Sequence, residues 1–136
     1  MPSFRRAVAA AAVALSALSV ASLVAGCTDG GRTTAPPPGE AESAALAPSD
    51  PRLAGLYENS CKTCHTVRDS LAPLTGDRGA WDARWTQGED ALLRVAIAGR
   101  NGMPAGGQCF ACTPADLRAL TRFMAGREGE TGREGG

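Results

Sequence analysis

The chain has 136 residues, room for one domain at most, and its 14 basic and 14 acidic side chains cancel. Without residues 1–26, which have the pattern of an export signal, 12 basic and 14 acidic side chains remain, a formal net charge of −2. So small an imbalance argues against nucleic acid or an anionic membrane surface as the main partner.

Residues 1–26 are predicted to be a signal peptide. Arg5 and Arg6 come first, and an uncharged, largely apolar run follows from Ala7 to Cys27. The run ends in LVAGC, which resembles the lipobox of bacterial lipoproteins and would make Cys27 the acylated first residue of the mature chain. Cleavage without lipid and retention as a membrane helix are the alternatives. We expect a lipid-anchored protein on the periplasmic side of a bacterial membrane, where cysteines can keep disulfides.

Two segments lack the side chains needed for a core. Residues 27–49 are rich in Gly, Pro, Ser and Thr, and they predict a flexible tether behind the lipidated cysteine. Residues 126–136 predict a disordered tail. The folded domain is therefore expected at 50–125, and a core of that size usually needs a covalent staple or a cofactor.

The first two predicted helices are separated by a long loop. Asp50 followed by Pro51 is typical of a helix start, and this helix is expected to run into Cys61. After a loop interrupted by proline and glycine, the segment AWDARWTQ predicts a short helix with its two tryptophans four residues apart on one face.

Two longer helices follow. EDALLRVAIAG has acidic residues in its first turn and Gly99 at its end, and TPADLRALTRFMAG begins with Thr113 and Asp116 placed for a capping box. No alternating pattern of a strand is present, so we expect an all-α fold of three to five helices. The predicted inward-facing residues are Leu92, Leu93, Ala96 and Ile97 in the first of these helices, and Leu117, Leu120, Phe123 and Met124 in the second.

The sequence CKTCH at residues 61–65 is the attachment pattern of c-type haem. Cys61 and Cys64 lie three apart, so both sulfurs can face the same side of a helical turn and reach the two vinyl groups of the porphyrin. His65 follows directly and is placed to ligate the iron on the proximal side. It is also the chain's only histidine.

Three other interpretations of this motif are possible. A thioredoxin-like dithiol usually lies in a βαβ unit, and the sequence predicts none. A zinc site with Cys109 and Cys112 would leave 44 residues between the two pairs, well beyond the usual 15 to 20. Chance occurrence of five residues is the third possibility, and the export signal argues against it. We therefore expect one covalent haem c.

Four stretches together resemble the class I monohaem cytochromes c, and among them the bacterial cytochrome c5-like group. They are CKTCH, APLTGDRGAW, LLRVAIAGRNGMPAGGQC and CFACTPADLRAL, and the resemblance extends from about Leu53 to Met124. It implies a small all-α fold with three to five helices wrapped around one haem. It also implies a monomer that exchanges electrons with a redox donor and a redox acceptor protein.

The resemblance also implies roles for single residues. Met103 matches the distal sulfur ligand of the iron, whereas the rival Met124 lies on the apolar stripe of the last helix and is expected in the core. Pro73 matches a proline whose carbonyl accepts a hydrogen bond from the haem-ligating imidazole. Trp81 matches an aromatic residue beside the haem. The segment MPAGGQC departs from the Lys-Gly-Gly arrangement more usual in relatives, so no docking role is assumed for it.

The second Cys-x-x-Cys pair, Cys109 and Cys112, is followed by Thr113, so it cannot hold a second haem of this type. A working dithiol would need surroundings that stabilise a thiolate, and the sequence shows none. A structural disulfide remains and fits the c5-like pattern. It would stiffen the loop that carries Met103, and it leaves Cys27 as the odd cysteine for lipid.

With histidine and methionine on the iron no coordination position stays open, so the predicted function is one-electron transfer rather than catalysis. Two alternatives stay open. The protein could be the haem c subunit of an oxidoreductase complex. It could also be a gas sensor or peroxidase-like protein, if Met103 is not a stable ligand.

Overall fold

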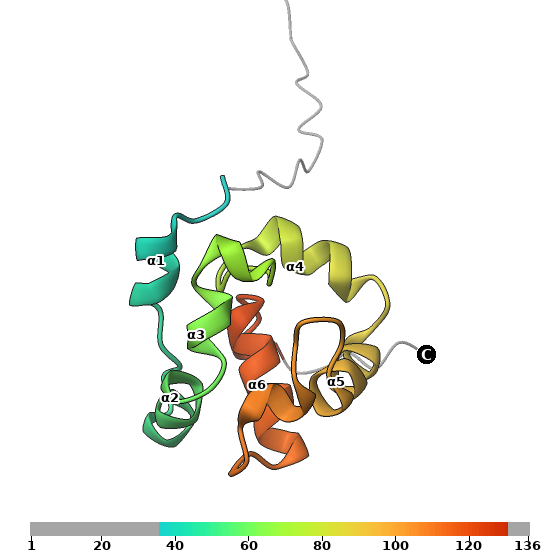
Figure 1. Cartoon of the computed structure of the whole chain (residues 1–136). Helices are drawn as coiled ribbons and strands as arrows, with labels where there is room; N and C mark the ends of the chain where they lie inside the picture. The colour runs from blue at the N-terminus through green and yellow to red at the C-terminus, as the bar shows by residue number, and fades with distance from the viewer. Residues whose placement is uncertain (1–35, 131–136) are drawn as a thin grey trace, which may run out of the picture. The chain divides into compact units, whose positions relative to one another are not determined.

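The computed structural model describes residues 36–130, and this part of the chain is helical without a β-strand (Figure 1). The prediction of an all-α fold is confirmed. The signal segment and Cys27 lie outside the described residues. Within 36–130 no helix is both long and apolar enough to cross a membrane. In chain order the helices are α1 (Glu40–Ala45), α2 (Pro51–Glu58), α3 (Lys62–His65), the 3-10 helix η1 (Arg68–Ser70), α4 (Arg78–Trp85), α5 (Glu89–Ala98), the 3-10 helix η2 (Ala105–Gln108) and α6 (Pro114–Met124).

Helix starts follow the predicted capping residues. The Asp50 carboxylate accepts a hydrogen bond from the backbone N–H of Leu53 at 2.9 Å, and α2 begins there. At α6 the Thr113 hydroxyl accepts from the N–H of Asp116, and the Asp116 carboxylate accepts from the N–H of Thr113. Such caps satisfy backbone donors that have no partner inside a helix, which explains why these boundaries can be predicted from sequence.

The core forms where α6 packs against α2 and α5 (Figure 1). The rings of Tyr57 and Phe123 meet edge to face with their centroids 5.0 Å apart. Met124 is buried here, in the core position expected for it. The buried cluster consists of Tyr57, Cys61, Trp81, Leu120, Phe123, Met124 and Ala125.

The predicted inward-facing position is wrong for one residue of α5. In α5, Leu92 and Ala96 are buried, but Ile97 leaves 44% of its surface exposed. Residues four apart share a helix face, and Ile97 lies about 100° further round that helix than Ala96. The buried face of α5 is therefore narrower than the face that the apolar residues of the sequence predict.

The predicted flexible tether is wrong for its last part. Residues 40–45 form α1, which lies beside α3 (Figure 1, cyan and green), and the side chain of Ser43 is fully buried. The Glu40 carboxylate also accepts a hydrogen bond from the backbone N–H of Arg68 at 2.6 Å. These contacts are polar, so the segment has no apolar pattern from which its packing could be predicted. The folded unit begins before residue 40 rather than at 50.

The predicted disordered tail is likewise wrong for residues 126–130. The Arg127 guanidinium bonds to Asp82 at 2.6 Å and to Glu130 at 2.8 Å, and it lies 4.8 Å from the ring centre of Trp85. An arginine can thus hold a glycine-rich segment without apolar residues against the folded domain. Residues 131–136 lie outside the described part.

Candidate haem site

The CKTCH motif forms a single helical turn. The backbone carbonyl of Cys61 accepts hydrogen bonds from the N–H groups of Cys64, at 3.2 Å, and His65, at 3.0 Å. Neither Cys61 nor Cys64 is in a disulfide; Cys61 is buried and Cys64 is exposed. Burial raises the pKa of Cys61 above its ordinary value, so this thiol is not a poised thiolate. Two thiols on one turn suit thioether attachment better than a redox dithiol.

The imidazole of His65 is held in one orientation. Only 6% of the residue is exposed, and its Nδ1 lies 2.8 Å from the carbonyl oxygen of Pro73. Because a carbonyl can only accept, Nδ1 carries the proton and donates it, and Nε2 keeps a free lone pair. Burial also lowers the pKa of the imidazole, which favours the neutral ring that a metal ion requires.

Trp81 from α4 supports the same ring. Its indole lies nearly parallel to the His65 imidazole, with ring centres 5.7 Å apart and planes inclined by 25°. The indole N–H donates to the carbonyl of Leu74 at 2.8 Å, which positions the tryptophan itself. Two successive carbonyls of one loop, those of Pro73 and Leu74, therefore orient the two stacked rings.

Met103 lies in a turn that follows α5. Its backbone exchanges two hydrogen bonds of 2.9 Å with that of Arg100. A Cβ atom on Gly99 would lie 2.7 Å from the carbonyl oxygen of Met103, and Gly99 has a φ of +79°. Only glycine allows both this backbone conformation and this close approach. The Met103 side chain is half-buried, and its methyl group lies close to Gly107.

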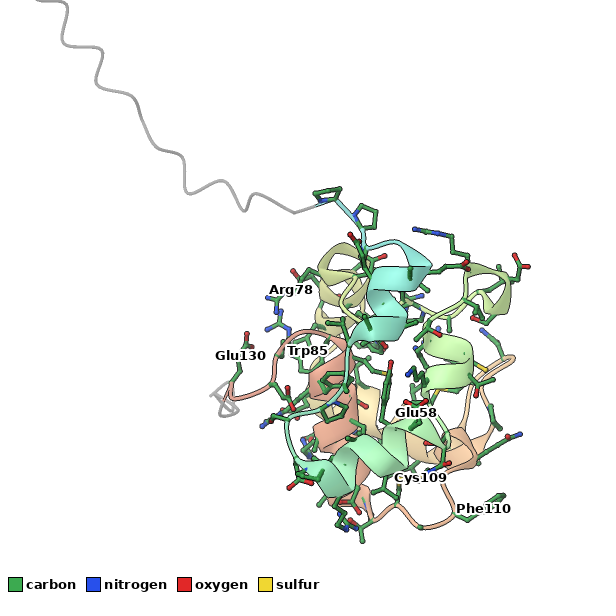
Figure 2. All side chains as sticks on the ribbon, turned by 90° about the vertical axis from the view of Figure 1, so that its left-hand side faces the viewer. Glu58, Arg78, Trp85, Cys109, Phe110 and Glu130 are labelled. Atoms are coloured by element: carbon green, nitrogen blue, oxygen red, sulfur yellow. A yellow bond between two sulfur atoms is a disulfide. The ribbon has the colours of Figure 1, made fainter. Side chains whose placement is uncertain are left out.

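Cys109 and Cys112 form a disulfide with their Cα atoms 5.3 Å apart, the pairing that the sequence predicts. The bridge joins Cys109, at the end of η2, to Cys112, which directly precedes the α6 cap Thr113. Phe110, inside this four-residue loop, is 98% exposed, and Figure 2 shows its ring projecting away from the body of the protein. The bridge therefore connects the Met103 loop with the helix at the centre of the core.

The residues present fit a covalently attached haem. The motif supplies two thiols on one turn and an imidazole with a free Nε2. Val67 and Leu71, which follow it, expose apolar surface of the kind that can cover a porphyrin. In the part of the chain that the structure describes, His, Cys, Asp and Glu side chains nowhere gather in a group of three or more suited to a metal ion, so a zinc site finds no support.

Comparison with known proteins gives consistent matches. A family model described as cytochrome C oxidase, cbb3-type, subunit III, matches residues 49–124. Cytochrome c5 of Ectopseudomonas mendocina is 38% identical over 73 residues, which are 52% of this chain and 84% of that protein. Cytochrome c-555 of Chlorobaculum tepidum is 36% identical over 75 residues, which are 52% and 69% of the two chains.

A solved structure agrees with the sequence matches. It is a chain from the crystal structure of an electron transfer complex of nitrite reductase with cytochrome c. That chain is 37% identical, with a TM-score of 0.51, and the match covers 57% of this protein and 95% of the other. The chain belongs to the class I monohaem cytochromes c, in the cytochrome c5-like group.

As a c5-like cytochrome, the protein carries covalently bound haem c, and Cys61 and Cys64 fit the attachment motif. Its relatives are electron carriers rather than enzymes, and electron transfer is accordingly the function of this haem protein.

Sequence reasoning missed a set of buried polar residues beside the cytochrome motif. Ser43, Tyr57 and Thr75 are fully buried and connected by hydrogen bonds. Tyr57 could have been found, because it is the only large polar residue on the inner face of α2. Ser43 and Thr75 carry no such signal, since the Ser43 hydroxyl donates to backbone carbonyls and the Thr75 hydroxyl pairs with that of Tyr57, all far away in the sequence.

Proposed function

We propose that this cytochrome is a membrane-tethered carrier that moves one electron at a time through a haem c ligated by His65 and Met103. The observation that carries the proposal is the buried imidazole of His65, whose Nδ1 donates to the Pro73 carbonyl at 2.8 Å. This bond leaves Nε2 as the only ligating atom and fixes the ring plane. A metal ligand needs both features.

The bound haem would supply the Fe(III)/Fe(II) couple. Cys61 and Cys64 would hold it through thioether bonds, and His65 would be its proximal ligand. The Pro73 carbonyl polarises the N–H of the imidazole and raises its basicity, while Trp81 keeps water away from the stacked face. If Met103 also held the iron, no position would be free for a substrate, and the haem would supply one-electron chemistry without bond making or breaking.

The disulfide Cys109–Cys112 would support the Met103 side of the site. The Gly-rich segment between Met103 and Cys109 contributes backbone hydrogen bonds but few buried side chains. A thioether is a weak ligand, so the loop that presents it must be stiff. Linking the end of this loop to the cap of α6 supplies that stiffness.

We also propose that residues 1–26 direct export and that Cys27 carries the lipid anchor. Because the folded unit includes α1, the link between the lipid and the domain would be shorter than the tether of residues 28–49 expected from sequence, for which a reach of about 26 Å follows. The domain would work close to the periplasmic face of the membrane and as a monomer.

The partner is proposed to be a redox protein of a respiratory chain or a periplasmic oxidoreductase. The solved neighbour comes from an electron transfer complex with nitrite reductase, and the family model bears the description of an oxidase subunit. That description favours a second candidate function, a haem c subunit of an oxidoreductase complex. Extraction in a mild detergent separates the two, since a subunit stays with its enzyme and a carrier elutes alone.

Optical spectra of the intact protein test the iron ligands. We expect a low-spin spectrum, a sulfur-to-iron charge-transfer band in the oxidised form, and no carbon monoxide binding at neutral pH. Binding of carbon monoxide without denaturant, together with a missing sulfur band, would show an open position and favour a sensor or peroxidase-like protein. Intact mass would report the haem, the lipid and the disulfide at once.

A further inference from the structure

Ser43 connects α1 to the loop that holds the histidine. Its hydroxyl lies 2.9 Å from the carbonyl of Thr75 and 3.2 Å from the carbonyl of His65. The serine is fully buried, and so is Thr75. Since a carbonyl only accepts, the hydroxyl proton is shared between these two oxygens.

Three successive carbonyls in this loop each accept from a different side chain. Pro73 accepts from the His65 imidazole, Leu74 from the Trp81 indole, and Thr75 from the Ser43 hydroxyl. The first two bonds orient the stacked rings of the haem site. The third comes from α1, upstream of residues 49–124, which match the family model.

The loop and the histidine are also linked through their backbones. The N–H of Thr75 donates to the carbonyl of His65 at 2.7 Å, and the N–H of Gly76 donates to Met124 at 2.8 Å. The peptide between Thr75 and Gly76 is thus held on one side by Met124 and on the other by Ser43. Among the described residues, Ser43 is the one partner of the Thr75 carbonyl. Its loss would leave a buried acceptor unpaired, and the loop would have to shift to satisfy it.

We propose that Ser43 is a positioning residue for His65. It fixes the loop whose Pro73 carbonyl accepts a hydrogen bond from the imidazole, and so strengthens this bond from Nδ1. A stronger bond makes the imidazole a better electron donor and favours Fe(III), so Ser43 lowers the reduction potential. This inference rests on the proposed function, in which His65 ligates the iron.

The test uses full-length, haem-loaded protein with the substitution Ser43→Ala. We expect the ring N–H of His65 to exchange with deuterium about tenfold faster in the reduced protein, the factor that follows from losing one ordinary buried hydrogen bond. The midpoint potential should shift to more positive values in the same variant. NMR reports the first quantity and optical redox titration the second.

The matched control is Glu40→Ala. It removes another contact of α1, the bond from the N–H of Arg68, but leaves Ser43 and the three carbonyls untouched. We expect lower thermal stability and wild-type values for both site readouts. Equal changes in the two variants would mean that α1 acts only as packing, and this would overturn the proposal.

Unchanged exchange and potential in Ser43→Ala would overturn it as well. If that variant does not fold, Ser43→Cys keeps the volume with a weaker donor, and the same two readouts should move in the same direction by less. Failure of the proposed function is recognised separately in the wild type. There the His65 ring would show none of the haem-induced chemical shifts of an iron ligand.

Discussion

The two sides of the proposed haem site are held by different forces. The His65 side is held from within the core, by the stack on Trp81 and by hydrogen bonds to consecutive loop carbonyls. The Met103 side consists of a turn closed by backbone hydrogen bonds, a glycine that permits close approach, and a disulfide further along. The His65 side should therefore resist change as one unit with the core, whereas the Met103 side should respond to single local substitutions.

The largest effect is expected when the His65 side is broken by Trp81→Ala. The substitution removes a buried ring from the core cluster and frees the Leu74 carbonyl, at a cost of about 3–5 kcal/mol in the free energy of unfolding. Denaturant unfolding of the haem-loaded protein measures it. Trp85→Ala, which truncates a half-buried ring of the same helix, should cost clearly less. Equal losses in the two variants would contradict the larger stabilising role assigned to Trp81.

On the Met103 side, Gly99→Ala should act on stability and on ligation together. A Cβ at this residue meets the Met103 carbonyl at 2.7 Å, and the positive φ adds strain of order 1–3 kcal/mol. We expect weakening of the sulfur-to-iron band. Gly88→Ala is the matched control, because Gly88 has a similar φ of +85° but open space around its Cβ. The Gly88→Ala variant should keep the sulfur-to-iron band at wild-type intensity. Loss of the band in that variant would mean that backbone strain, and not the contact with Met103, weakens the ligation.

Replacing both Cys109 and Cys112 with Ser tests the disulfide. The loop-closure model gives only about 2 kcal/mol for so short a loop, and haem should remain attached through Cys61 and Cys64. Loosening of the Met103 loop should lower the pH at which alkaline conditions displace the sulfur ligand. Hydrogen exchange of the His65 ring should not change. An unaltered displacement midpoint would show that the bridge has no influence on the methionine.

The smallest effect concerns the ion pair Arg52–Asp116, which lies in the first turn of α6. The Arg52 guanidinium, with the N–H and hydroxyl of Thr113, holds the pKa of the Asp116 carboxyl well below its usual range. A carboxyl with a lowered folded-state pKa stabilises the fold above its unfolded pKa, about 3.9, and this contribution disappears as the pH falls.

In Arg52→Gln we therefore expect slightly lower stability at pH 7 and a curve that approaches the wild type in strong acid. Urea unfolding across the acid range measures this. Lys62→Gln, which removes an exposed pair with Glu58, serves as the control. Parallel curves for Arg52→Gln and the wild type down to low pH would contradict the assignment to Asp116.

Much of the fold could be predicted because its signals are local. The caps at Asp50 and Thr113 bond to residues three positions away, and an apolar stripe such as that of α6 repeats at a fixed spacing. The limits of the folded unit could not be predicted in this way. Residues 40–45 and Arg127 are held by polar partners tens of residues away, and neither composition nor periodicity registers such contacts.

The sequence by itself determined the chemistry of this cytochrome, because the CKTCH spacing, the single histidine and the second cysteine pair are properties of neighbouring residues. Only the tertiary structure decided how the histidine is held. The Pro73–Thr75 loop collects its hydrogen bonds from His65, Trp81 and Ser43, which come from three different helices. A backbone carbonyl looks the same in every sequence, so its partner is known only once the chain has folded.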